Sequence, residues 1–172
     1  GLTVEACENE FKQAEWAKAG DGVTLGSRAD MLLRDDKGGK VVFDFKYSRS
    51  HKYYKELIEN NLTLQLEFYR YMAKQEFGKE TNVRVAYVLL PDVTILTADD
   101  FDDIDTITLN PERADSNVMN EAANSYRLRW EQLKAGKIER VEGCDVGSGE
   151  YAEQEAEQNL FPLAEYKGIY SE

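Results

Sequence analysis

Apolar and polar side chains alternate through two neighbouring stretches of the chain, residues 23–33 and residues 41–48. This period of two is typical of β-strands. The segment between them, RDDKGGK at 34–40, is polar and contains adjacent glycines, which predicts that the two strands form a hairpin. AGDG at 19–22 has the composition of a turn. Residues 4–17 fit either an amphipathic helix or an irregular strand, and we favour the strand.

The period of the pattern changes after residue 50. Apolar side chains recur at steps of three and four, which is helical spacing, until Gly78 ends the run. The later chain adds strands, an acidic loop-like segment and a helix whose predicted apolar face carries three large side chains. The elements expected are a helix over 52–77 with a candidate break at NNLT (60–63), a strand at 83–91, a short strand at 93–96 and a helix over 117–135 with Tyr126, Trp130 and Leu133 on its apolar face.

The order of these elements is strand, strand, strand, helix, strand, helix, which predicts an α/β sandwich. Regular Rossmann alternation and a glycine-rich phosphate loop are both missing from the sequence. The 172 residues fit one domain, which we assign to residues 1–143, with an acidic C-terminal extension at 144–172. The chain opens without methionine, which suggests a domain of a longer protein.

Charge narrows the classes of function. The chain has 21 basic and 33 acidic residues, a formal net charge of −12. Such a balance argues against a protein that binds nucleic acid through a broad basic surface, but leaves room for an enzyme whose metals face the phosphates. No apolar run approaches the roughly 20 residues that span a bilayer, so a soluble cytoplasmic protein without a membrane partner is expected. Cys7 and Cys144 belong to no C-x-x-C pattern and are expected to be reduced thiols.

An aspartate and a lysine interrupt the apolar run VVFDFKYS at 41–48. On a strand, Asp44 and Lys46 share one face. Asp30 lies on the preceding strand, and cross-strand neighbours are roughly 5 Å apart, so the two carboxylates can converge on one divalent ion. Hard oxygen ligands suit Mg²⁺ or Mn²⁺. A metal that activates water, with Lys46 beside a phosphate, fits hydrolysis of a phosphodiester.

Three motifs in order resemble those of the PD-(D/E)XK nuclease superfamily, most closely its RecB-type (AddB/RecB-like) branch. They are SRAD at 27–30, VVFDFK at 41–46 and Q-x-x-x-Y at 65–69, and the likeness covers residues 23–73. The resemblance implies a restriction-endonuclease-like central mixed β-sheet flanked by α-helices. It also implies a Mg²⁺-dependent (or Mn²⁺-dependent) DNA exonuclease of recombination, repair or mobile-element biology, with a helicase or other domain of a longer chain as partner.

The same resemblance implies roles for individual residues. Asp30 and Asp44 would bind the metal, with the backbone carbonyl of Phe45 as a third ligand, and Lys46 would be the catalytic lysine. Gln65 and Tyr69 would orient the active site or contact the nucleic-acid backbone; an i, i+4 pair lies on one face of a helix.

A short basic stretch follows the D-x-K strand. Arg49 and Lys52, together with His51 and Lys55, are candidates for contacts with DNA. The alternative is an ordinary solvated loop, and for His51 alone we favour this alternative.

The sequence departs from the family pattern at three points. Ser27 replaces the usual glycine, although Gly26 is adjacent and could rebuild the turn. The branch's upstream histidine is missing: either its motif precedes residue 1 in a longer chain, or Glu5, Glu8 or Glu10 serves in its place. The four cysteines that hold an iron–sulfur cluster in some relatives are absent, so no iron–sulfur cluster is expected.

Other readings of the same residues stay open. Asp44 and Lys46 could be a structural ion pair at a strand end, and Gln65 and Tyr69 a polar seam on a core helix. At the level of function, the alternatives are a catalytically inactive nuclease-fold module that binds DNA or serves as a scaffold, and an acidic protein–protein adaptor.

Overall fold

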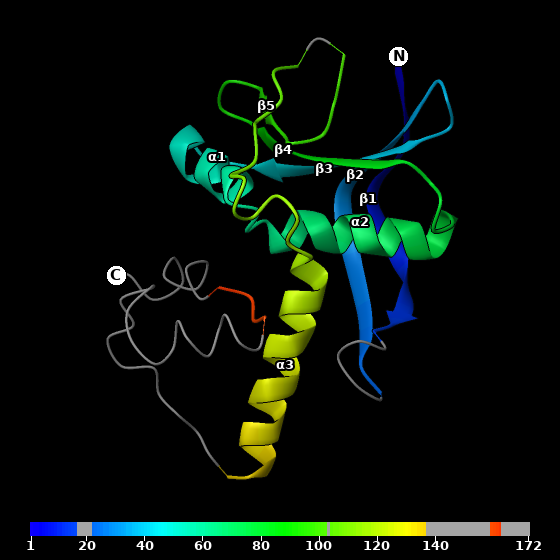
Figure 1. Cartoon of the computed structure of the whole chain (residues 1–172). Coiled ribbons are helices and arrows are strands. Elements are labelled where there is room, and N and C mark those ends of the chain that lie inside the picture. The colour runs from blue at the N-terminus through cyan, green and yellow to red at the C-terminus, as the bar shows by residue number, and fades with distance from the viewer. Residues whose placement is uncertain (17–21, 103, 137–158, 163–172) are drawn as a thin grey trace. The chain divides into compact units, whose positions relative to one another are not determined.

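The structure, a computed structural model, describes residues 1–16, 22–102, 104–136 and 159–162 (Figure 1). Most of the turn expected at 19–22, and all of the C-terminal extension except 159–162, lie outside these residues. The strands are β1 (Leu2–Glu15), β2 (Thr24–Asp35), β3 (Lys40–Lys46), β4 (Val83–Leu89) and β5 (Thr94–Leu96), and the helices are α1 (His51–Glu59), α2 (Leu64–Phe77) and α3 (Val118–Lys134).

The five strands form one mixed sheet in the order β1-β2-β3-β4-β5. The β1–β2, β2–β3 and β4–β5 pairs are antiparallel, whereas β3 and β4 are parallel. A parallel pair needs a crossover connection, and α1 and α2 provide it. The predicted mixed sheet with flanking helices is therefore confirmed, and the segment left open between helix and strand is the strand β1.

The β2–β3 hairpin is closed by the turn that its glycines predict. Asp35 Oδ1 accepts hydrogen bonds from the backbone N–H groups of Lys37 and Gly39 at 2.9 and 2.7 Å. Gly38 has φ +86°, a left-handed conformation that glycine adopts without steric cost. This tight connection fixes the register of β2 against β3, which in turn decides which side chains lie opposite each other.

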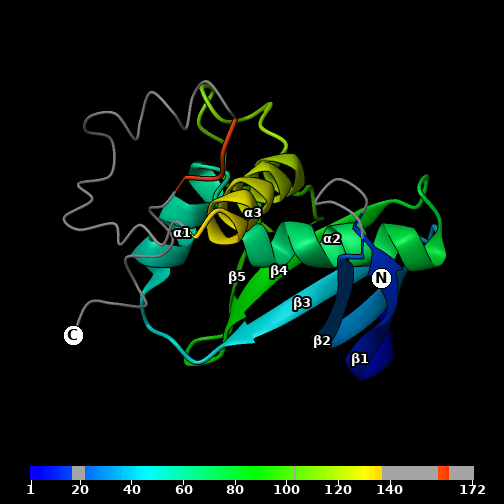
Figure 2. The ribbon, with the colours of Figure 1, turned by 90° about the horizontal axis from the view of Figure 1, so that it is seen from below.

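Helix α2 lies along one face of the sheet (Figure 2). Its apolar side chains pack on alternate residues of the strands and form the larger part of the core. Met72 and Val42 are fully buried there, and Leu32 is 3% exposed. The opposite face carries a second, smaller core, in which Leu33, Val41, Phe43, Ala86 and Val88 pack with Phe101 from the segment that follows β5.

The expected break of the long helix occurs where the sequence places it. Helix α1 ends at Glu59 and α2 begins at Leu64. Asn61 adopts a positive φ of 50°, and its side-chain amide donates to the backbone oxygens of Arg113 and Ser116 at 3.0 and 3.2 Å. The break therefore separates α1 from α2, and the Asn61 side chain ties it to residues 113–116.

The chain separates into two compact units, the first of residues 1–15 and 24–116 and the second of residues 16–23 and 117–172. Helix α3 belongs to the second unit. Its first turn is capped by Asn117, whose side chain accepts from the backbone N–H of Asn120 at 3.0 Å, a common N-cap arrangement.

The apolar face predicted for this last helix is wrong. Tyr126, Trp130 and Leu133 are 40%, 45% and 53% exposed, and the buried positions of α3 are Val118, Glu121 and Ala123. The rings of Tyr126 and Trp130 instead pack on other aromatic side chains. Tyr126 stacks on Trp130 with ring centroids 6.4 Å apart and also contacts Trp16.

A second expectation also needs correction. Gly26 and Ser27 lie inside the continuous strand β2 and form no turn. A Cβ at Gly26 would meet Cγ of Gln13 at 3.4 Å, an ordinary van der Waals contact, so the position does not require glycine. None of α1, α2 and α3, the helices of the described residues, has the length and apolar character that crossing a bilayer requires.

Candidate active site

Two carboxylates occupy neighbouring positions on β2 and β3. Met31 pairs with Phe43 in the antiparallel ladder, so Asp30 and Asp44 are the next residues on the two strands. Alternation places both on the face that carries Leu32 and packs under α2. Asp44 is 2% exposed, while Asp30 is half-buried. The hairpin thus places both carboxylates on one side of the sheet, as the sequence predicts.

Asp30 is held against the D-x-K strand by a backbone contact. Its Oδ2 accepts a hydrogen bond from the N–H of Phe45 at 2.7 Å. A hydrogen bond from a backbone amide to a carboxylate is short and strong. The contact therefore orients the Asp30 side chain toward the part of β3 that carries Asp44 and Lys46.

Lys46 and Asp44 form an ion pair that a third side chain completes. Lys46 Nζ lies 2.8 Å from Asp44 Oδ2 and donates to Oε1 of Gln65 at 2.8 Å. The Gln65 amide donates in turn to Asp44 Oδ1 at 2.8 Å. One helical glutamine therefore contacts both ends of the pair, and the Lys46 side chain is 24% exposed.

Tyr69 packs one turn after Gln65 and faces the same carboxylate. Its hydroxyl lies 3.1 Å from Asp44 Oδ1 and 3.3 Å from the backbone oxygen of Arg28, and it accepts from the Gln65 amide at 3.1 Å. The Tyr69 side chain is 5% exposed. The i, i+4 pair of the Q-x-x-x-Y motif thus meets on one helical face and points at the strands.

The electrostatic environment of the site perturbs two of its groups. Burial raises the pKa of the Asp44 carboxyl above its ordinary 3.8; the ammonium of Lys46 opposes this rise, whereas the charge of Asp30 adds to it. Burial and the nearby Asp44 carboxylate raise the pKa of the Tyr69 phenol to about 12. Strongly perturbed groups clustered around charge partners are a feature of functional sites.

The residues at this place fit a divalent cation. Asp44 Oδ2 is buried and receives no hydrogen bond of acceptable geometry, even though Lys46 Nζ is close to it. The Lys46 ammonium offsets part of the cost of burying this oxygen, and a divalent cation would offset the rest. Asp30 lies beside it with only Oδ2 engaged among the described residues. Two carboxylate oxygens suit Mg²⁺ or Mn²⁺.

The predicted ligand set is small. Among the described residues no group of three or more His, Cys, Asp or Glu side chains could hold a metal ion. The set predicted from the sequence, two carboxylates with the backbone carbonyl of Phe45, contains only two such side chains. The role of that carbonyl stays a prediction, since the contact of Phe45 recorded at the site is the one from its N–H group to Asp30.

The predicted basic stretch lies where β3 leads into α1. Arg49 is exposed and forms no ion pair with any residue that the structure describes. Lys52 lies 3.6 Å from Glu56 and Lys55 lies 3.7 Å from Glu59, both as i, i+4 pairs on α1. His51 Nε2 lies 2.6 Å from Asp92. Arg49 is thus the cation of this stretch most available to a phosphate.

The glutamates considered as substitutes for the missing histidine have other contacts. Glu5 forms ion pairs with Lys40 at 2.5 Å and Arg34 at 3.3 Å, and Glu8 lies 3.4 Å from Arg28. Glu10 pairs with Arg28 in the β1–β2 ladder. Neither of the two glutamates with ion pairs contacts Asp30 or Asp44.

Sequence reasoning did not find Tyr87. This tyrosine is the β4 residue that pairs with Asp44 in the parallel ladder. Its ring is 2% exposed and lies 5.5 Å from Lys46 Nζ, as a cation–π contact. The signal was the alternation of VRVAYVL, which places Val83, Val85 and Tyr87 on one face, but only the register between β3 and β4 brings that ring under the lysine.

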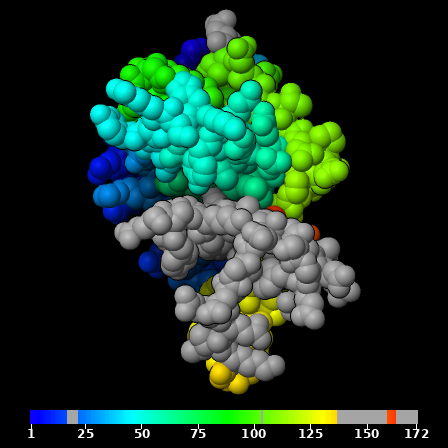
Figure 3. Space-filling model, turned by 90° about the vertical axis from the view of Figure 1, so that its left-hand side faces the viewer, coloured from blue at the N-terminus to red at the C-terminus, as the bar shows by residue number. Residues whose placement is uncertain are grey.

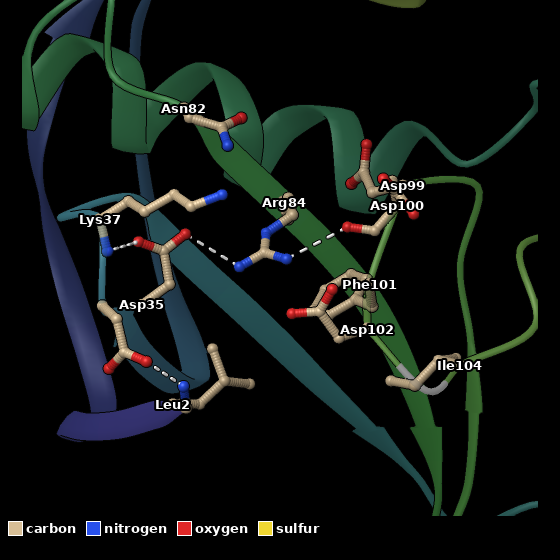
Figure 4. A pocket seen from close by; sticks show the side chains of 12 residues that line it. Leu2, Asp35, Lys37, Asn82, Arg84, Asp99, Asp100, Phe101, Asp102 and Ile104 are labelled. Carbon is tan, nitrogen blue, oxygen red and sulfur yellow. Dashed lines mark hydrogen bonds and ion pairs between the residues drawn. The ribbon is translucent and has the colours of Figure 1, made fainter.

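A separate cavity of about 600 Å³ lies on the other face of the sheet (Figure 4). Arg84, at the start of β4, crosses it, donating to Asp35 Oδ2 at 2.9 Å and to the backbone oxygen of Asp100 at 3.1 Å. The carboxylates of Asp99 and Asp102 also line it. With its arginine already paired and several acidic side chains around it, the cavity is a poor match for a phosphate.

The chain belongs to the PD-(D/E)XK nuclease superfamily, whose model matches residues 2–148. Neither the curated proteins nor the solved structures contain a match to it. The superfamily consists generally of nucleases that use divalent metals, and its members are mostly enzymes that act on DNA. Membership thus supports the phosphodiester chemistry that the site geometry fits.

Proposed function

We propose that the chain is a metal-dependent DNA nuclease of the RecB-like exonuclease class. The observation that carries the proposal is the network in which Gln65 bridges Asp44 and Lys46 while Asp30 lies on the same face of the sheet. Each of the three sequence motifs contributes polar side chains to this cluster: Asp30, the Asp44–Lys46 pair, and the Gln65–Tyr69 pair. A purely structural ion pair would need neither the second carboxylate nor the glutamine.

Each side chain has a defined part in this proposal. Asp30 and Asp44 would hold Mg²⁺ or Mn²⁺, which supplies Lewis-acid activation of water and stabilises charge on the leaving oxygen. Lys46, whose side chain is partly exposed, presents a positive charge to the attacked phosphate. Gln65 fixes the ammonium of Lys46 and the carboxylate of Asp44 relative to each other, and Tyr69 keeps Asp44 Oδ1 in place.

The wider role is also part of the proposal. The nuclease would act in recombination, repair or mobile-element biology, as one domain of a longer chain or beside a helicase. The site residues are those predicted from the sequence: Asp30, Asp44 and Lys46 for catalysis, Asp30, Asp44 and the Phe45 carbonyl for the metal, and Gln65, Tyr69, Arg49 and Lys52 for contact with nucleic acid.

A second candidate is a catalytically inactive module that binds DNA or serves as a scaffold. The net charge of −12 favours it, since few cations remain to attract a long duplex. The intact trio of Asp30, Asp44 and Lys46 favours the enzyme, because buried charges cost free energy that a retired site has no reason to retain.

Cleavage assays separate these candidates. Linear duplex and single-stranded DNA are incubated with the protein, with Mg²⁺ or Mn²⁺ and with EDTA. The nuclease proposal expects metal-dependent degradation that Lys46→Ala abolishes. Lys12→Ala, which removes an exposed lysine from β1 of the same sheet, is the matched control and should keep full activity. Binding without cleavage would support the inactive module, and degradation by Lys46→Ala at the parental rate would indicate a contaminant.

A further inference from the structure

Three tyrosine rings form a continuous row from the catalytic lysine to the surface. Tyr87, buried under Lys46 Nζ, contacts Tyr54 with ring centroids 5.0 Å apart and planes inclined by 59°. Tyr54 contacts Tyr53 at 5.1 Å and 79°, an edge-to-face geometry. Tyr87 is 2% exposed and Tyr53 is 43% exposed, so the row begins in the core and ends in solvent.

The outer ring stands on a surface formed by α1. Figure 3 shows the face of the molecule on which this helix is open to solvent. Tyr53 follows Lys52 on the first turn of α1, in the segment that leads directly from the D-x-K strand. Edge-to-face contacts between aromatic rings are favourable, and Tyr54 is itself braced by a buried ring. Tyr53 is therefore an exposed aromatic side chain with a supported orientation.

A supported exposed ring binds a flat partner at low cost in conformational entropy. Base–aromatic stacking is sequence-tolerant because every nucleobase has a π-face. In a duplex these faces are covered by neighbouring base pairs, whereas an unpaired base offers them. The row therefore suits an unpaired nucleobase on the strand whose phosphate lies at Lys46.

The charges around the row favour stacking over phosphate attraction. The neighbouring cations Lys52 and Lys55 are each paired with a glutamate on α1, and the chain carries a net charge of −12. Affinity that depends on neutralised phosphates is weak on such a surface. Stacking supplies affinity without added positive charge, so a short aromatic subsite matches this protein better than a long basic groove.

We propose that Tyr53, supported by Tyr54 and Tyr87, is a base-stacking subsite for an unpaired nucleobase of the strand that is bound at Lys46. The proposal rests on the proposed nuclease function and adds a substrate class to it: strands with unpaired bases at the site, such as single strands and frayed ends. Tyr53 is a binding residue here, whereas Lys46 remains the catalytic one.

The test is a binding titration that needs no cleavage. A fluorescently labelled oligothymidine of 12 nucleotides is titrated with the Lys46→Ala chain in Mg²⁺, and its anisotropy is measured. The same background then carries Tyr53→Leu, which keeps apolar volume without a ring, or Tyr53→Phe, which keeps the ring. An abasic oligonucleotide of the same length gives the binding that remains without bases.

The expected result has three parts. Tyr53→Leu binds the oligothymidine about 5- to 100-fold more weakly, the range that stacking of one base supports. Tyr53→Phe stays within about twofold of the parent. The abasic strand binds the parent and the Tyr53→Leu chain equally.

Several results would overturn the subsite. The subsite is wrong if the parent does not bind oligothymidine, or if Tyr53→Leu binds it as tightly as the parent. It is also wrong if Tyr53→Phe loses as much affinity as Tyr53→Leu, or if Tyr53→Leu loses the same affinity for the abasic strand. Cleavage by the unaltered chain is measured separately. If it degrades DNA while Tyr53→Leu binds normally, the subsite fails and the nuclease stands; if it degrades none while Tyr53→Leu loses affinity, the nuclease fails instead.

Discussion

Gln65 donates its side-chain amide to Oδ1 of Asp44 at 2.8 Å. The oxygen of the same amide accepts from Lys46 Nζ at 2.8 Å. A planar amide can hold an acceptor and a donor in a fixed mutual position, so this helical residue sets the geometry of the charged pair on β3. The Q-x-x-x-Y and D-x-K motifs are thus one physical unit rather than two.

Loss of this amide should weaken catalysis without abolishing folding. Gln65→Ala removes one hydrogen bond from Asp44 and one from Lys46, and residues that orient metal ligands typically contribute 10- to 100-fold, so we expect cleavage to fall by about that factor. Single-turnover cleavage in saturating Mg²⁺ measures it. Gln75→Ala, at an exposed position of the same helix α2, is the control and should cleave normally. Equal rates for Gln65→Ala and the parent would contradict the bridging role.

Metal affinity should depend on pH through Asp44. Burial holds the pKa of this carboxyl above 3.8, and a metal binds only the deprotonated form, so affinity is present above that raised pKa and is lost as the pH falls through it. Calorimetric titration with Mn²⁺ at several pH values between 4 and 7.5 should give a midpoint above 3.8. An affinity for Mn²⁺ that stays constant from pH 7.5 down to pH 4 would contradict this prediction.

The free energy of unfolding at alkaline pH should depend on the ionisation of the Tyr69 phenol. Its pKa is about 12 in the folded protein against 10.0 in the unfolded chain, so between these values the folded state holds a proton that the unfolded state has lost. The contribution to stability is complete below pH 10 and decreases as pH rises to 12, by up to about 2.7 kcal/mol.

Tyr69→Phe removes this pH-dependent contribution. The difference in unfolding free energy between the parent and Tyr69→Phe, measured by urea denaturation at pH 9 and pH 11.5, should therefore fall by about 2 kcal/mol at the higher pH, enough to reverse its sign. At pH 9 the variant should be less stable by about 1 kcal/mol, the usual value of one hydrogen bond. A difference that stays constant from pH 9 to pH 11.5 would contradict the raised pKa.

Arg70 should be essential for the placement of α2 over the sheet. Its guanidinium contacts Glu67 at 3.1 Å and Asp99 at 2.9 Å and donates to the backbone oxygen of Val83. Breaking a largely buried pair leaves an uncompensated charge, so Arg70→Ala should lower the unfolding free energy by about 3 kcal/mol. Arg34→Ala, which removes an exposed partner of Glu5, should cost less than about 1 kcal/mol. Equal losses of unfolding free energy for Arg70→Ala and Arg34→Ala would contradict the role of Arg70 in placing α2.

The site could be predicted from sequence because its members lie on locally determined elements. Alternation on two strands joined by a tight turn places Asp30 with Asp44, and helical spacing places Gln65 with Tyr69. Neither inference needs the rest of the fold. The mixed sheet itself followed from resemblance to known nucleases, since strand order alone does not tell parallel from antiparallel pairing.

Contacts between distant segments could not be predicted. The ring of Tyr87 reaches Lys46 only because β4 pairs with β3 in one particular parallel register, and no local pattern encodes that register. The same holds for Arg70, whose partner Asp99 follows a different strand. The apolar face expected of α3 was wrong because helical periodicity identifies a stripe but does not show whether Tyr126 and Trp130 are covered or stack on each other in solvent.

The parallel pairing of β3 with β4 also has a consequence for how the protein folds. The β2–β3 hairpin is local, so Asp30 and Asp44 can come together early, whereas Gln65, Tyr69 and Tyr87 join them only after residues 47–82 have crossed over. Non-local pairings of this kind are slow to form. Nascent chains would therefore hold two adjacent carboxylates before their partners arrive, and competence for chemistry would appear only after β4 has been synthesised and has paired with β3.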